Sequence, residues 1–142
     1  MINNVSALAL DVGLARIGLA TNPIGVRIAQ PQGFIANTNE VIQEIADRIE
    51  KDQITDLVIG LPRGLQGQDT AQTQYVNEFA SKIEQAISIP IHMQDEALTS
   101  VKAEEELKSR GAPFEKGDID ALAATYILQD FLDELPEESH AV

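Results

Sequence analysis

Short apolar runs alternate with amphipathic stretches along the chain. Residues 5–11 form an apolar run that ends in Asp11, and residues 16–21 form a second run a few residues later. Runs of this length are typical of strands, and so short a connection predicts an antiparallel hairpin. A weaker apolar run at 33–37 predicts a third strand that extends the same antiparallel sheet.

The apolar period changes to helical spacing after residue 40. Short strands and helical stripes then alternate, with helices expected at 41–49, 70–87, 100–110 and from residue 118, and strands at 55–62 and 89–93. Right-handed crossover connections make such later strands parallel. We therefore predict an α/β domain whose mixed five-stranded sheet has three antiparallel strands first, then parallel crossovers, with helices on its faces.

Composition narrows the class of protein. The chain has 142 residues, of which 44% are hydrophobic, a size and composition typical of one domain. It contains no cysteine, which excludes disulfides, thiolate metal sites and cysteine nucleophiles, and its two histidines disfavour a multi-histidine zinc site. The apolar runs are too short to span a membrane, so we expect a cytoplasmic domain that makes no membrane contact.

The chain carries 10 basic and 23 acidic residues, a net charge of −13. Spread evenly, this charge would argue against nucleic acid as a partner. It is concentrated instead in the last third of the chain, where residues 99–142 hold 4 basic and 11 acidic residues. We predict a folded domain over residues 1–132 and an acidic, flexible tail over residues 133–142.

Carboxylates follow the predicted strands. Asp11 ends the first strand, and Asp95 and Glu96 follow the fifth, while Asp120 lies beside the apolar stripe of the last helix. The carboxyl ends of parallel strands meet at one edge of a sheet, where ligands bind. Each residue also has a structural explanation: a turn cap for Asp11, a solvated loop for Asp95 and Glu96, and a favourable helix-dipole interaction for Asp120.

If Asp11, Glu96 and Asp120 converge, their charges repel and shift each other's pKa values. Divalent cations relieve that repulsion, and a donor set made only of carboxylate oxygens selects Mg²⁺ or Mn²⁺. Two such ions can activate a water molecule and stabilise the leaving oxygen in phosphodiester cleavage. The spacing therefore suggests a metal-dependent hydrolase of phosphodiesters.

Four motifs in order make the sequence recognisable. They are DVGLARIGLA at 11–20, VIGLPRGLQG at 58–67, DEALTS at 95–100 and KGDIDALAA at 116–124. The chain resembles the RuvX (YqgF) family of bacterial RNase H-like nucleases, described as Holliday-junction resolvases and as pre-16S rRNA processing nucleases. The resemblance covers about residues 5–132.

The resemblance implies an RNase H-like fold and an endonuclease that acts on structured nucleic acid, whether the 5′ end of pre-16S rRNA or a Holliday junction. It also implies a possible homodimer, because junction cleavage needs two symmetric cuts. Its catalytic carboxylates, which also bind the Mg²⁺ or Mn²⁺, carry over to Asp11, Glu96 and Asp120. Candidate phosphate contacts are Arg16 and Lys116, which match the motifs, and Arg63, which is placed by its loop; each also fits a solvated surface charge.

One departure leaves other functions open. The family usually has an arginine after the Asp-Glu pair, and this chain has Ala97. A non-catalytic nucleic-acid-binding module on the same fold is therefore an alternative. A second alternative is an ATP-binding domain of the actin and sugar-kinase type, although those proteins close two such domains around the nucleotide.

Overall fold

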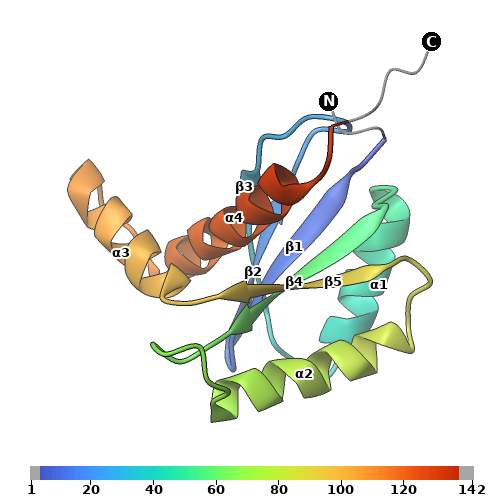
Figure 1. The fold of residues 1–142 in the computed structure, drawn as a ribbon, viewed down its shortest axis with the longest axis horizontal. Coiled ribbons are helices and arrows are strands. Elements are labelled where there is room, and N and C mark those ends of the chain that lie inside the picture. Colours follow the sequence, from blue (N-terminus) through green and yellow to red (C-terminus); the bar gives the residue numbers. More distant parts are fainter. Residues whose placement is uncertain (1–3, 138–142) are drawn as a thin grey trace.

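The computed structural model describes residues 4–137, which form one sheet with helices on both faces (Figure 1). Along the chain the elements are β1 (Ala7–Val12), β2 (Arg16–Thr21), β3 (Gln30–Ala36), α1 (Val41–Lys51), β4 (Asp56–Pro62), α2 (Ala71–Glu84), β5 (Ile91–Glu96), α3 (Thr99–Arg110) and α4 (Lys116–Glu134). Their order confirms the predicted succession of three strands followed by alternating helices and strands.

The five strands lie in the order β3-β2-β1-β4-β5, with β1 in the centre. β2 pairs antiparallel with β1 and with β3, whereas β4 pairs parallel with β1 and β5 pairs parallel with β4. The predicted mixed sheet is therefore confirmed. Because β1, β4 and β5 run in one direction, their carboxyl ends at Val12, Pro62 and Glu96 lie at the same edge of the sheet.

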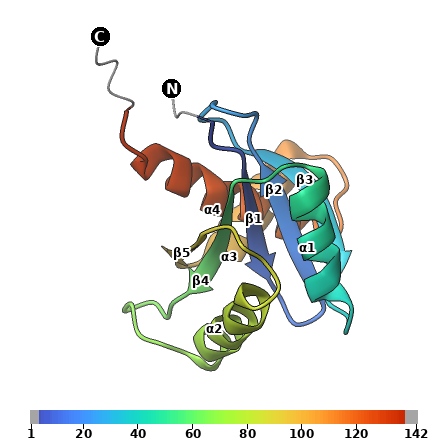
Figure 2. The ribbon, with the colours of Figure 1, turned by 90° about the vertical axis from the view of Figure 1, so that its right-hand side faces the viewer.

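The two faces of the sheet carry different side chains. Helices α1 and α2 cover one face and α4 covers the other, with α3 beside α4 (Figures 1 and 2). Side chains alternate along a strand. Leu8 and Leu10 of β1 belong to the core cluster with α1 and α2, whereas Ala7 and Ala9 pack with α4. Asp11 has the parity of the two alanines, so it faces α4.

Small residues let α4 lie close to the sheet. Ala9, Ala20 and Ala124 are fully buried in the cluster between them. A Cβ atom on Gly60 of β4 would lie 2.3 Å from Cδ1 of Ile127, so the glycine leaves room for the Ile127 side chain where α4 crosses this strand. The close approach brings side chains near the amino end of α4 to the carboxyl edge of the sheet.

Three boundaries differ by three residues from those expected: α2 ends at Glu84 rather than at residue 87, β5 ends at Glu96 rather than at 93, and β3 begins at Gln30 rather than at 33. The register of β3 is set by backbone pairing with β2, in which Thr21 is opposite Gln30. Its side chains are almost all exposed, so the apolar pattern carries little information about where this edge strand begins.

The carboxyl end of α4 lies beyond the predicted end of the domain at residue 132. The helix continues to Glu134, and Leu135 packs against the cluster between α4 and the sheet. Residues 138–142 of the predicted tail lie outside the described residues. In the described part of the chain, no helix has the length and apolar character needed to cross a membrane.

Candidate active site

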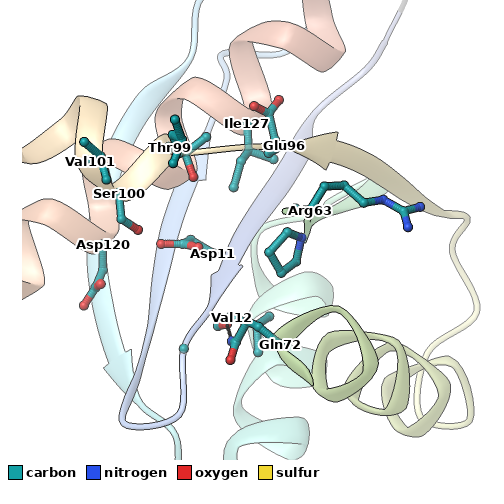
Figure 3. Close-up of a pocket in the computed structure, with 14 residues that line it drawn as sticks. Asp11, Val12, Arg63, Gln72, Glu96, Thr99, Ser100, Val101, Asp120 and Ile127 are labelled. Carbon is teal, nitrogen blue, oxygen red and sulfur yellow. Dashed lines mark hydrogen bonds between the residues drawn. The ribbon is translucent and has the colours of Figure 1, made fainter. Parts of the chain in front are cut away.

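A pocket of about 320 Å³ opens at the carboxyl edge of the sheet (Figure 3). Asp11, Glu96 and Asp120 line it, as does Arg63 at the end of β4. The first residues of α3, Thr99 to Val101, form another part of its wall. The fold therefore brings the three carboxylate residues predicted from the sequence to one pocket, although their carboxylates have different partners.

Asp11 is the deepest of the three carboxylates. It stands on β1, the central strand, and faces α4 because it alternates with Val12, which belongs to the core on the other face. None of the residues 4–137 donates a hydrogen bond to its carboxylate. Burial, followed by repulsion from Asp120, raises the pKa of Asp11 to about 7. A buried acid without a donor, close to a second acid, is a favourable place for a cation.

Asp120 comes from the second turn of α4 and has a cationic partner. Nε of Arg16 donates a hydrogen bond of 2.6 Å to Oδ2 of Asp120, and this ion pair joins residues 104 positions apart. Arg16 begins β2 and has the parity of Gly18 and Ala20, so it faces α4 as Asp11 does. The period of the strand thus explains why this arginine meets Asp120.

The Glu96 carboxylate is directed away from Asp11, although the residue lines the pocket (Figure 3). Glu96 shares its strand face with His92, whose ring lies 4.8 Å from that of Phe131 of α4. Burial, together with a side-chain hydrogen bond to Asp130 and repulsion from it, raises the pKa of Glu96 to about 8, against the opposing effect of Lys102. The fold therefore brings Asp120 close enough to Asp11 to raise its pKa, but the Asp120 carboxylate pairs with Arg16 and the Glu96 carboxyl is held by α4.

Asp95 has the opposite parity from Glu96 and takes a different partner. Nε of Arg63 lies 3.3 Å from Oδ1 of Asp95, and the same guanidinium also pairs with Asp69. The backbone N–H of Arg63 donates to the carbonyl of Glu96 at 3.0 Å. Arg63 therefore ties the loop that follows β4 to the end of β5, at the mouth of the pocket.

The remaining predicted substrate contact is more distant. Lys116 is exposed at the first position of α4 and does not line the pocket. Ala97 is exposed in the connection between Glu96 and Leu98, two residues that do line it. Arg16 is thus ion-paired with Asp120 and Arg63 with Asp69 and Asp95, while Lys102 is the cation that acts on Glu96.

The donor set suits a hard divalent cation. Asp11 and Asp120 present carboxylate oxygens beside one pocket, and such oxygens are the ligands that Mg²⁺ and Mn²⁺ prefer. As arranged, the described residues contain no group of three or more His, Cys, Asp or Glu side chains placed to hold a metal ion. Asp11 therefore faces the pocket directly, and Asp120 and Glu96 complete the set only if they turn from Arg16 and Asp130.

Asp130 was not among the residues predicted from the sequence. Its position carries a weak signal, because it follows the pocket residue Ile127 by three positions, a spacing that makes neighbours on a helix. The contact with Glu96 depends on how α4 lies on β5, which the sequence of either element alone does not give. The pairing of Arg16 with Asp120 was missed for the same reason.

Comparison with known proteins agrees with the fold. The model of the RuvX family, described as "Holliday junction resolvase", matches residues 5–134. A protein of Chloroflexus aurantiacus is 40% identical over 146 residues, covering 98% of this chain and 95% of its own length. One of Sulfurihydrogenibium sp. is 40% identical over 94% of both chains, and one of Maridesulfovibrio salexigens is 36% identical over 90% of this chain and 98% of its own. All three are named "Putative pre-16S rRNA nuclease".

Two solved structures share the architecture at low sequence identity. Thermus thermophilus RuvC in complex with a Holliday junction superposes with a TM-score of 0.57 and 14% identity, over 91% of this chain and 94% of the other. The Fowlpox virus resolvase in complex with Holliday junction DNA gives a TM-score of 0.52 and 10% identity, over 94% of this chain and 100% of the other. These similarities support the fold.

The mixed sheet, the helices on both of its faces and the matched relatives define a nuclease of the RNase H-like class. The family model covers almost the whole chain, and the relatives match over nearly their full lengths. The chain belongs to the RuvX family.

Proposed function

We propose that this nuclease is a Mg²⁺- or Mn²⁺-dependent endonuclease that hydrolyses phosphodiester bonds in structured nucleic acid. The observation that carries the proposal is the meeting of Asp11 and Asp120 at one pocket, where Asp11, largely desolvated and without a hydrogen-bond donor among residues 4–137, lies close enough to Asp120 to be repelled by it. A divalent cation beside Asp11 would offset both the desolvation of this carboxylate and that repulsion.

The residues have separate roles in this proposal. Asp11, Asp120 and, after it leaves Asp130, Glu96 hold the metal ion. The bound ion would supply an activated water and stabilise the leaving oxygen. Arg63, at the mouth of the pocket, and Arg16 and Lys116 contact the phosphates on either side of the cleaved bond, because guanidinium groups pair well with phosphate oxygens.

The names of the relatives suggest two substrates. Proteins at 36–40% identity are named for pre-16S rRNA, and the family description names the Holliday junction. We take the 5′ end of pre-16S rRNA as the first substrate to test and branched DNA as the second. Either substrate would place the protein in the cytoplasm of a bacterial cell. Symmetric cleavage of a junction would also require a homodimer with a two-fold axis.

A cleavage assay on the two substrates in parallel tests the proposal. Purified protein with Mn²⁺ should cut at least one of them, and Asp11→Asn should reduce the rate by several orders of magnitude, because it removes a carboxylate from the deepest position of the site. Asp47→Asn, the same chemical change at an exposed position of α1, is the matched control and should cut normally. Cleavage that survives in Asp11→Asn would disprove the assignment.

A second candidate function, nucleic-acid binding without cleavage, has one observation in its favour. The Glu96 carboxyl bonds to Asp130 rather than facing Asp11, and Ala97 adds no cation beside it. A binding module would retain affinity for the same RNA or junction and show no metal-dependent product. The assay therefore separates the two functions if binding is measured by gel shift on the same samples.

A further inference from the structure

The carboxylates of Asp11 and Asp120 differ in their hydrogen-bond donors. Asp11 has no hydrogen-bond donor among residues 4–137, whereas Asp120 accepts from Nε of Arg16 at 2.6 Å. Both residues line the same pocket, and Arg16 does not line it. The close-up shows the Asp11 carboxylate directed toward the Asp120 side of the pocket, while the Asp120 carboxylate is turned away from Asp11 (Figure 3).

We propose that Arg16 is the counter-ion of Asp120 in the metal-free protein and gives up this carboxylate when a divalent cation binds beside Asp11. The released guanidinium is then free to pair with a phosphate of the substrate. This inference rests on the proposed function and adds an order of events to it: Asp120 changes partner before Arg16 contacts nucleic acid.

The geometry allows the exchange by rotation of two side chains, those of Asp120 and Arg16, without movement of the backbone. The backbone at Arg16 is fixed, because its carbonyl accepts from the N–H of Gly13 at 2.9 Å and the residue begins a strand paired on both sides. The side chain is bound more lightly, through Nε alone among the described residues, and is about one-third exposed. A long side chain at the surface end of a rigid strand can therefore leave Asp120 without disturbing the sheet.

Arg63 provides the contrast that makes the inference specific. It also lies at the site and is paired with carboxylates, but its partners are Asp69 and Asp95, which lie on the other side of β5 from Glu96 and do not line the pocket. Because those partners do not line the pocket, a cation bound beside Asp11 should leave the ion pairs of Arg63 in place. Removal of either arginine takes one positive charge from the site, and only removal of Arg16 frees Asp120.

Such an exchange couples two binding events. If Arg16 becomes available to phosphate only after it leaves Asp120, the metal increases the affinity for nucleic acid, and nucleic acid increases the affinity for metal by the same factor. The part of this coupling that depends on Arg16 disappears in Arg16→Gln. The part that arises from simple neutralisation of the acidic pocket remains.

The exchange can be followed directly on the full chain by NMR of the arginine Nε–H groups. In the metal-free protein the Nε–H of Arg16 should show the low-field, slowly exchanging signal of a donor bonded to a carboxylate. Saturating Mg²⁺ should shift or abolish that signal and leave the Nε–H of Arg63 in place. An Arg16 signal that is unchanged while Mg²⁺ occupies the site would overturn the inference.

Calorimetry with Mn²⁺ gives an independent reading. Arg16→Gln should bind Mn²⁺ more tightly than the unaltered protein, by roughly fivefold or more, the lower end of typical couplings between sites. Arg63→Gln, the charge-matched control, should change the Mn²⁺ affinity much less. Equal effects of the two substitutions would mean that Arg16 acts through its charge alone and would overturn the exchange.

Asp11→Asn distinguishes failure of this inference from failure of the proposed function. If the unaltered protein shows no Mn²⁺ binding that depends on Asp11, the metal site itself is absent and both proposals fail. If the protein binds Mn²⁺ through Asp11 but the Arg16 signal and the Arg16→Gln affinity match those of the controls, only the exchange fails.

Discussion

Gly18 of β2 and Asp120 of α4 are in backbone contact: a Cβ atom on Gly18 would lie 1.9 Å from the carbonyl oxygen of Asp120. No side chain fits between these two elements. The glycine therefore sets the distance at which Asp120 stands from Asp11, the residue that Gly18 opposes in the β1–β2 pairing.

Gly18→Ala should consequently damage both the fold and the site. The added methyl group meets backbone, which cannot move without shifting α4, and overpacking of this kind typically costs about 1–3 kcal/mol or more. We expect a clearly lower melting temperature and loss of cleavage. Gly33→Ala is the control: its positive φ of 74° makes alanine strained, but nothing lies near the new methyl group, so stability should fall while cleavage survives.

Neutralising Asp11 should stabilise the metal-free protein at neutral pH. The pKa of Asp11 is about 7 in the folded state against 3.8 for an aspartate in water, so the folded state favours the protonated form. Its contribution to stability is fully present below about pH 4 and is lost as the pH rises through 7, a difference of up to about 4 kcal/mol. Glu96, with a pKa of about 8, acts in the same direction.

Thermal melts in EDTA across pH 4–9 measure this effect. The melting temperature of the unaltered protein should fall steadily as the pH rises. Asp11→Asn should show a smaller fall of melting temperature with pH and a higher melting temperature at pH 8. Asp120→Asn should give no such gain, because it also deprives Arg16 of its partner. Identical slopes for the unaltered protein and Asp11→Asn would show that Asp11 ionises as it does in water.

Divalent metal should offset the loss of folding stability that the ionised carboxylates cause. Millimolar Mn²⁺ at pH 8 should raise the melting temperature of the unaltered protein, since a ligand that binds only the folded state stabilises it by about 2.7 kcal/mol at a hundredfold excess over its Kd. Asp11→Asn should show little of this rise. An equal rise in both proteins would place the metal elsewhere.

The carboxyl end of α4 offers a test of where the domain ends. Leu135 packs against the α4 cluster, and its carbonyl accepts from Nη2 of Arg27 at 2.6 Å. A chain ending after Leu132 loses both contacts and should melt several degrees lower, on the basis of about 1 kcal/mol for a partly buried leucine. A chain ending after Glu137 keeps both and should melt close to the full-length protein; equal losses would refute this boundary.

Ala97→Arg should strengthen binding of nucleic acid. Ala97 is exposed between two pocket residues, so an arginine there adds a cation at the mouth of the site. We expect tighter binding and a slope of log affinity against log salt that is steeper by about one counterion. Ala86→Arg, at an exposed position between α2 and β5, is the control for the same added charge away from the site. An unchanged slope in Ala97→Arg would show that position 97 does not face phosphate.

The period of the strands explains what the sequence could predict. Asp11 ends an apolar run, and its parity with Ala7 and Ala9 places it on the face that α4 covers, so its location at the carboxyl edge followed from the pattern alone. The antiparallel pairing of the first strands and the parallel direction of the later ones followed from the short hairpin and the right-handed crossovers. These features depend on residues that are close in sequence or on a general rule of handedness.

The partners of the carboxylates could not be predicted in the same way. Arg16 meets Asp120 across 104 positions, and Glu96 meets Asp130 only because α4 lies over β5 at a particular angle. Sequence spacing brings residues to one edge of a sheet, but the direction of a carboxylate depends on the neighbours it finds there. All three acids that were expected to converge line one pocket, but Arg16 holds the carboxylate of Asp120 and Asp130 that of Glu96.

The central place of β1 gives the pocket one wall that resists local opening. Most of this strand is paired on both sides, Ala7 to Leu10 with β4 and Leu8 to Val12 with β2, so hydrogen exchange at the residues before Asp11 should require opening of the sheet. The opposite wall consists of the loop after β4 and the start of α3, which lie outside the sheet and have fewer buried contacts. A substrate of irregular shape would therefore be accommodated by movement of that wall, while the carboxylate at the bottom of the pocket keeps its position.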